Sequence, residues 1–144
     1  MKITVFGGSG FLGSHVADKL SLNKNKVTIF DKKKSKWIKD NQNFVLGDIL
    51  DKAKVDKCVK GSNYVYIYAG IADLDTYFDK PFETAESNIL GLINILNACV
   101  KHNVKRVIYA STVYVNSNEG GFYKCSKKAA EDFIREYKKL FNLD

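Results

Sequence analysis

Short apolar runs alternate along the chain with longer segments in which apolar residues recur every three or four positions. The runs that we expect to form strands are Ile3 to Phe6, Lys26 to Phe30, Asn43 to Leu46, Tyr64 to Tyr68 and Arg106 to Ala110. Helical segments lie between most of them. This alternation is typical of βαβ units and predicts a parallel sheet rather than hairpins.

The spacing within the helical segments predicts which face of each helix is buried. Leu12, Val16 and Leu20 recur every four residues after the first strand, and a short helix is expected over 53–59. A helix over about 82–102 carries an apolar stripe of Ala85, Ile89, Leu92, Leu96 and Val100. A last helix over about 123–141 carries a broad apolar face of Ala130, Phe133, Ile134, Tyr137 and Phe141.

Right-handed crossovers between these elements predict an α/β fold, a doubly wound parallel sheet with strand order 3-2-1-4-5. Residues 71–82 have no clean period, so we expect a loop there, near the ligand side of the sheet. Ligands of such sheets bind beyond the carboxyl ends of the strands. The residues of interest therefore follow the predicted strands.

Composition narrows the class of protein. A chain of 144 residues that is 45% hydrophobic is expected to be one soluble domain, and no window is apolar enough to span a membrane. The net charge of +7 comes from scattered lysines, which favours anionic ligands over nucleic acid. Three widely spaced cysteines are expected to be reduced thiols of a cytoplasmic protein, without a metal site.

A glycine-rich segment follows the first strand and precedes a helix. We call residues 7–13 the glycine loop. Its glycines Gly7, Gly10 and Gly13 allow a tight turn, bring bare backbone against a pyrophosphate and direct the positive end of the helix toward it. Glycines also serve turns alone, so the loop by itself leaves both interpretations open.

Acidic residues follow the second and third strands. Asp31 lies where a carboxylate accepts hydrogen bonds from the adenosine ribose hydroxyls and repels a 2′-phosphate. NAD is therefore favoured over NADP, although Lys32 to Lys34 could neutralise such a phosphate. Asp48 and Ile49 could read the adenine edge, and Asp48 could equally be a helix cap.

Three residues form a candidate catalytic set. Tyr123 and Lys127 are four positions apart on the last predicted helix and share a face. Taken alone, this pair is better explained as a core tyrosine and a surface lysine. A lysine ammonium beside a phenol favours the phenolate, which would make the tyrosine a proton acceptor. Thr112 follows the fifth strand, where its hydroxyl could reach the same substrate oxygen. Together with the glycine loop, these residues are far more specific than any one of them.

With these motifs in place, the chain resembles the amino-terminal part of an extended short-chain dehydrogenase/reductase, the family of NAD-dependent nucleotide-sugar epimerases and dehydratases. The motifs that carry the resemblance are Gly7, Gly10 and Gly13 with Phe11 and Leu12 between them, Asp31, Asp48, Ile49, Ala69, Gly70, Asn88, Ser111, Thr112, Tyr123 and Lys127. The glycines follow the family's GxxGxxG spacing, and Tyr123 to Lys127 follow its YxxxK spacing.

The resemblance implies a function and a role for each motif. Tyr123 would act as acid and base on a sugar hydroxyl, Lys127 would hold the nicotinamide ribose, and Thr112 would orient the hydroxyl. The remaining residues would contact NAD, including Ala69, Gly70, Asn88 and Ser111. The substrate would be a nucleotide-diphosphate sugar, and the helices 82–102 and 123–141 could pair in a homodimer.

The chain departs from the family pattern at two places. Val113 and Tyr114 stand where family dehydratases place acidic residues, so epimerisation or oxidation is favoured over dehydration. The loop between Thr112 and Tyr123 is also short, and the chain stops where extended members continue into a substrate lobe. Residues 1–144 are therefore expected to be an NAD-binding domain, and a piece of a longer protein is favoured over a stand-alone cofactor domain. Alternatives are a non-enzymatic dinucleotide sensor and a structural domain with an empty cleft.

Overall fold

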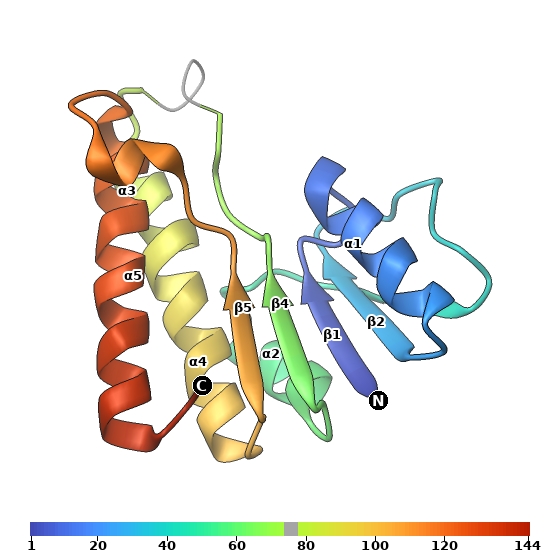
Figure 1. Ribbon diagram of the computed structural model, residues 1–144. Coiled ribbons are helices and arrows are strands. Elements are labelled where there is room, and N and C mark those ends of the chain that lie inside the picture. Colours follow the sequence, from blue (N-terminus) through green and yellow to red (C-terminus); the bar gives the residue numbers. More distant parts are fainter. Residues whose placement is uncertain (74–77) are drawn as a thin grey trace.

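A computed structural model describes residues 1–73 and 78–144. Its five parallel strands lie in the order β3-β2-β1-β4-β5, which confirms the predicted topology. Figure 1 shows β2, β1, β4 and β5 side by side in this order. The strands are β1 (Lys2–Phe6), β2 (Lys26–Asp31), β3 (Gln42–Leu46), β4 (Tyr64–Ile67) and β5 (Arg106–Tyr109). All five were predicted to within a residue at each end. Their carboxyl ends meet at one edge of the sheet (Figure 1).

The helices lie between and after the strands. They are α1 (Phe11–Leu22), α2 (Lys52–Val59), α3 (Pro81–Ala85), η1 (Glu86–Leu90), α4 (Gly91–Lys101), η2 (Val113–Asn116) and α5 (Gly121–Phe141). The predicted helix over 82–102 is therefore three segments, because the π-helical turn η1 interrupts it. Residues 71–73 and 78–80 form the predicted loop, and residues 74–77 lie outside the described residues. Residues 81 and 82 were also predicted to be loop, but they begin α3.

Two apolar layers cover the sheet. Ile3 and Val5 of β1 face α1, which packs Ala17 against them. Phe6 of the same strand faces the opposite layer, built by α2, α4 and α5. Because successive strand residues point to opposite faces, the sheet is buried on both sides. The polar residues that follow the strands are thereby left at its exposed carboxyl edge.

The predicted buried faces need correction at α1 and α5. Leu12 is 60% exposed, and Gly13, Ala17 and Ser21 form the buried stripe of α1 instead. Small residues are buried there because α1 lies close to the sheet, where larger side chains do not fit. On α5, Phe133 is 40% exposed.

Further along α5, Phe141 is 53% exposed, whereas Ser126, Lys127 and Ala130 are buried.

No helix in the described part of the chain is both long and apolar enough to cross a membrane.

Candidate functional site

The glycine loop brings the backbones of β1, α1 and β4 into direct contact. Gly7 has φ +76°, and a Cβ atom there would lie 2.4 Å from the backbone nitrogen of Ala69. A Cβ atom at Gly13 would lie 2.2 Å from the carbonyl oxygen of Gly7. Only glycine fits either position. The missing side chains leave bare backbone at the edge of the sheet, as a bound pyrophosphate requires.

The amino-terminal end of α1 faces this edge. Helix α1 begins at Phe11, after Gly10, and no described side chain caps it. The first N–H groups of a helix have no partner within the helix and carry its positive end. The side chains of Phe11 and Leu12 are 80% and 60% exposed. These two predicted contacts would therefore act through their backbone amides.

A cleft of about 460 Å³ lies beyond the carboxyl ends of β1, β2, β3 and β4. Six of the predicted cofactor-binding residues line it, namely Gly7, Gly10, Asp31, Ile49, Ala69 and Gly70. Residues that were not predicted to contact the cofactor also line it, among them Ser9, Phe30, Tyr68, Ile71 and Ser87. Among these residues, Ser9 could have been predicted from the sequence, because it lies inside the glycine loop.

Asp31 is held in place by the backbone on either side of the cleft. Its Oδ2 accepts a hydrogen bond from the N–H of Ser9 at 3.0 Å, and its Oδ1 accepts one from the N–H of Lys33 at 3.2 Å. A carboxylate has about four acceptor positions. Asp31 can therefore still accept hydrogen bonds from a ligand in the cleft.

Asp48 and Ile49 are neighbours in sequence but lie in different environments. Ile49 is 6% exposed and lines the cleft. Asp48 lies 2.9 Å from the ammonium of Lys32 and accepts a hydrogen bond from the N–H of Leu50 at 2.9 Å. Partial burial raises the pKa of Asp48, but the Leu50 N–H and Lys32 outweigh it and hold the pKa below the ordinary value of an aspartate. Lys32, which could have neutralised a 2′-phosphate, is thus paired with Asp48.

Lys127 joins α5 to the end of β5. Its side chain is buried, and its ammonium donates to the carbonyl oxygen of Ala110 at 2.8 Å. It lies 4.5 Å from the centroid of the Tyr109 ring and 5.8 Å from that of Tyr123. Burial lowers the pKa of Lys127 to about 8. The predicted pair of Tyr123 and Lys127 therefore meets in space at the predicted strand end.

Thr112 lies between two residues that contact α5. Ala110, on one side, bonds Lys127. Tyr114, on the other side, stacks edge-on against Tyr123, with ring centroids 6.4 Å apart. The Thr112 oxygen accepts a hydrogen bond from the N–H of Tyr114 at 3.3 Å, which leaves its own hydroxyl hydrogen for another acceptor.

Asn88 has a role that the sequence did not indicate. This residue was expected to contact the cofactor, but its side chain is buried and bonded within the protein. Its Oδ1 accepts from the N–H of Ile71 at 2.7 Å, and its Nδ2 donates to the Ile71 carbonyl at 2.9 Å and to Ser126 Oγ at 2.9 Å. Ser126 in turn donates to the carbonyl of Tyr123 at 2.7 Å.

This chain of hydrogen bonds connects two hollows. Ile71 lines the cleft, and it also lines a smaller cavity of about 190 Å³ with Thr84, Phe122 and Tyr123. A ligand that extends from the cleft past Ile71 would therefore reach Tyr123. Asn88 fixes the segment between the two hollows.

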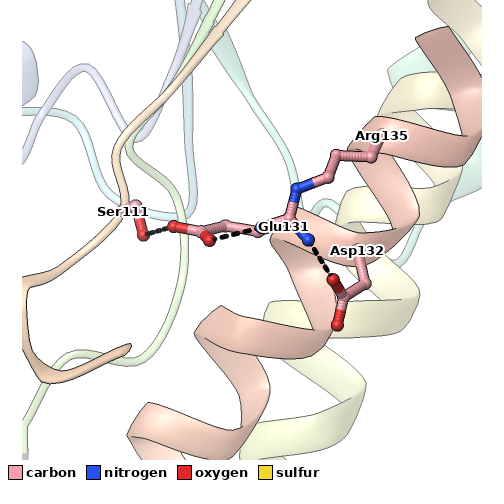
Figure 2. Close-up of polar contacts among 4 residues, drawn as sticks. All are labelled: Ser111, Glu131, Asp132 and Arg135. Atoms are coloured by element: carbon pink, nitrogen blue, oxygen red, sulfur yellow. Dashed lines mark hydrogen bonds and ion pairs between the residues drawn. The ribbon is translucent and has the colours of Figure 1, made fainter. Parts of the chain in front are cut away.

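Ser111 was also expected to contact the cofactor. Its hydroxyl instead donates to Oε1 of Glu131 on α5 at 2.5 Å (Figure 2). Glu131 is not among the residues that carry the family resemblance given above. The contact could not be found from the sequence, because the two residues lie twenty positions apart.

Known proteins resemble this chain along its whole length. A sequence model of the NAD dependent epimerase/dehydratase family matches residues 3–144. The chain is 38% identical over 114 residues to the UDP-N-acetyl-alpha-D-glucosaminuronate decarboxylase of Bacillus cytotoxicus, and this match covers 75% of the chain and 35% of that protein.

Two solved structures share the fold closely. The UDP-glucose 4-epimerase of Thermotoga maritima with UDP-glucose is 26% identical with a TM-score of 0.91, covering 99% of this chain and 53% of that one. The UDP-glucose 4-epimerase of Thermus thermophilus in complex with NAD is 27% identical with a TM-score of 0.88, covering 99% and 52%. The chain thus spans about half the length of these structures. With the family model matched over residues 3–144, the chain belongs to the NAD dependent epimerase/dehydratase family.

Proposed function

We propose that this chain is the NAD-binding and catalytic domain of a nucleotide-sugar epimerase or dehydrogenase, which acts by hydride transfer between a sugar carbon and nicotinamide. The observation that carries the proposal is the contact of Lys127 with Ala110, which brings Tyr123 and Lys127 together with the strand end that bears Thr112. The glycine loop and the uncapped end of α1 fit the pyrophosphate of NAD.

Each residue of this set has a distinct task. The phenol oxygen of Tyr123 takes the proton of a sugar hydroxyl while the hydrogen on the same carbon leaves as hydride. NAD, when bound, supplies the acceptor of that hydride. The Thr112 hydroxyl orients the sugar hydroxyl, and the Lys127 ammonium binds the ribose beside the nicotinamide. Return of the hydride to the opposite face of the keto-sugar would complete an epimerisation.

The proposal favours NAD over NADP and oxidation or epimerisation over dehydration. The carboxylate of Asp31 in the cleft repels a 2′-phosphate, and Lys32 is paired with Asp48. Val113 and Tyr114, which follow Thr112, have no acidic group for the elimination of water. A UDP-sugar is the substrate that we would test first, because the relatives named above are enzymes of UDP-sugars.

The decisive experiment uses the full-length gene product that contains this chain. Calorimetry with NAD and NADP is followed by turnover assays with UDP-, GDP- and dTDP-sugars. Tyr123→Phe should abolish turnover and leave NAD binding intact, because only the phenol hydroxyl is removed. Tyr137→Phe is the matched control, since Tyr137 lies on the same helix and donates to Asn97.

The same experiment addresses the alternative function, a non-enzymatic dinucleotide sensor. The short segment between Thr112 and Tyr123 is the observation that favours it. A gene product that binds NAD and converts none of these sugars, with Tyr123→Phe indistinguishable from the wild type, would support the sensor. Failure to bind either dinucleotide would support a structural domain with an empty cleft.

We also propose a cytoplasmic homodimer that pairs through α4 and α5. Phe133, Leu140 and Phe141 of α5 are 40%, 67% and 53% exposed, and burial of such side chains stabilises an interface. The unpaired thiols of the three cysteines support a reducing compartment. Analytical ultracentrifugation of the wild type and of Phe133→Ser tests the dimer, with Phe11→Ser on α1 as control.

A further inference from the structure

We propose that Glu131 is a positioning residue, which holds the end of β5 against α5 through Ser111 and so fixes the place of Thr112. The proposal rests on the function proposed above, because Thr112 matters only for that reaction. It concerns a residue outside the set of Thr112, Tyr123 and Lys127. Glu131 need not touch the sugar or NAD, and would act through the strand end.

The contact between Glu131 and Ser111 is short and charge-assisted. The Ser111 hydroxyl donates to Oε1 of Glu131 at 2.5 Å, across the gap between the strand end and the helix (Figure 2). Hydrogen bonds from hydroxyl groups to carboxylates are about twice as strong as neutral ones. A bond of this kind can hold a segment that has no place in the sheet ladder.

The position of Glu131 on α5 places it next to the catalytic residues. Tyr123, Lys127 and Glu131 follow one another at intervals of four residues, so they lie along one side of the helix. Lys127 bonds the carbonyl of Ala110, and Glu131 bonds the side chain of Ser111. Two successive turns of α5 thus hold the two residues that come immediately before Thr112.

Loss of either contact has a predictable effect. Without the Ser111 contact, the segment that follows β5 would be held at its two ends, by the bond of Lys127 to Ala110 and by the packing of Tyr114 against Tyr123, so Ser111 and Thr112 could shift between them. The hydroxyl of Thr112 would then sample positions out of reach of the sugar oxygen. Misplacement by about 1 Å can slow a reaction about a hundredfold.

Arg135 determines how the Glu131 carboxylate is oriented. It donates to Oε2 of Glu131 at 3.1 Å and also pairs with Asp132 (Figure 2). The Glu131 side chain is 26% exposed, whereas that of Asp132 is 58% exposed. Asp132 is therefore a matched control: it is the next residue, it has the same charge and the same arginine partner, and it lacks the contact with Ser111.

The kinetic experiment compares Glu131→Ala, Glu131→Gln, Ser111→Ala and Asp132→Ala in the full-length gene product. Glu131→Ala and Ser111→Ala should each lower kcat by about tenfold to a hundredfold, with the KM for sugar and the affinity for NAD unchanged. Their double variant should be no slower than either single variant, because both remove one contact.

Glu131→Gln keeps the acceptor oxygen and should restore most of kcat. Asp132→Ala should leave kcat unchanged. Equal effects of Glu131→Ala and Asp132→Ala, or additive effects of Ser111→Ala and Glu131→Ala, would overturn the proposal.

A second measurement does not need turnover. Hydrogen–deuterium exchange of the same proteins should be faster over residues 110–114 in Glu131→Ala and Ser111→Ala, and unchanged in Asp132→Ala. Unchanged exchange in Glu131→Ala overturns the positioning role. A wild type that binds NAD without turnover refutes the proposed function, and the exchange result still decides whether Glu131 holds the strand end.

Discussion

The side-chain amide of Asn88 bonds both backbone polar groups of Ile71, accepting from its N–H at 2.7 Å and donating to its carbonyl at 2.9 Å. The same amide also donates to Ser126. Ile71 lies in the loop that separates the cleft from the cavity beside Tyr123. One buried side chain therefore fixes the boundary between the cleft and the cavity.

Replacement of Asn88 by alanine should destabilise the protein markedly. The change removes three hydrogen bonds at a side chain that is 3% exposed, and each polar group left unpaired costs about 1–3 kcal/mol. We expect the free energy of unfolding in urea to fall by about 2–5 kcal/mol.

Asn94→Ala is the control for this prediction, because Asn94 lies on the adjoining helix α4 and makes one hydrogen bond, to the carbonyl of Ile49. Its loss should cost about 1 kcal/mol. If both variants lost a similar amount of unfolding free energy, the Asn88 contacts would contribute no more to stability than the single contact of the Asn94 side chain.

The glycine loop predicts a graded response to added methyl groups. A Cβ at Gly13 would lie 2.2 Å from the Gly7 carbonyl oxygen, whereas one at Gly10 would lie 3.3 Å from it. Alanine inside a helix is otherwise more favourable than glycine by about 1 kcal/mol. A loss of stability or of NAD affinity in Gly13→Ala would therefore be due to the clash with Gly7. We expect Gly13→Ala to weaken NAD binding by at least about tenfold, a change of about 1.4 kcal/mol in calorimetry.

Gly10→Ala is the comparison for that experiment. A Cβ at Gly10 would require a shift of only a few tenths of an ångström within the protein, so we expect the free energy of unfolding to fall less in Gly10→Ala than in Gly13→Ala. Gly10 also lines the cleft, where its added methyl would meet the pyrophosphate, so NAD affinity should fall in both variants. The prediction fails if Gly10→Ala and Gly13→Ala lower the free energy of unfolding equally.

Asp31 should determine the choice between NAD and NADP. Its carboxylate lines the cleft together with Lys33, and a carboxylate repels the 2′-phosphate of NADP. Asp31→Asn removes the charge and keeps an acceptor for the N–H of Ser9. We expect the ratio of NAD to NADP affinity to fall by about tenfold, or about 1.4 kcal/mol.

Asp48→Asn is the matched control, because it removes a charge that is paired with Lys32 beside the cleft. It frees that lysine, which also lines the cleft, and should improve NADP binding by less than Asp31→Asn, whose own charge is removed from the cleft. An unchanged preference in Asp31→Asn would assign selectivity to another residue.

The sheet and the local motifs were predictable because their signals lie close together in sequence. Each apolar run is short and is followed by small or polar residues, and the right-handed crossover rule then predicts the order of the strands. The glycine loop and the pair Tyr123 and Lys127 depend on spacing within one turn or one helix. The structure brings these residues to the expected edge of the sheet.

The contacts that connect these motifs could not be predicted. Asn88 bonds residues seventeen and thirty-eight positions away, and the π-helical turn that contains it has no signature in the apolar pattern. On α1, periodicity identified a leucine stripe, but the close approach of helix and sheet selects Gly13, Ala17 and Ser21 for burial. Tertiary packing decides both cases.

Lys127 should make stability depend on pH in the alkaline range. Burial lowers its pKa to about 8 from 10.5, so the folded state releases this proton at lower pH than the unfolded chain. Below pH 8 both states hold the proton, and the burial cost is present in full. As pH rises from about 8 to 10.5, the unfolded chain binds more protons than the folded one, and the free energy of unfolding rises.

Comparison with Lys127→Met isolates this contribution, because methionine does not titrate and the other groups are common to both proteins. Each pH unit between the two pKa values changes the free energy of unfolding by about 1.4 kcal/mol. Between pH 8 and 10.5 the free energy of unfolding of the wild type should therefore rise by about 3 kcal/mol relative to that of the variant. Urea unfolding at a series of pH values, without NAD, measures the difference. The exposed neighbour Lys128 supplies the control Lys128→Met, whose stability should follow the wild type throughout. A pH-independent difference between wild type and Lys127→Met would show that the ammonium of Lys127 is well solvated in the folded protein.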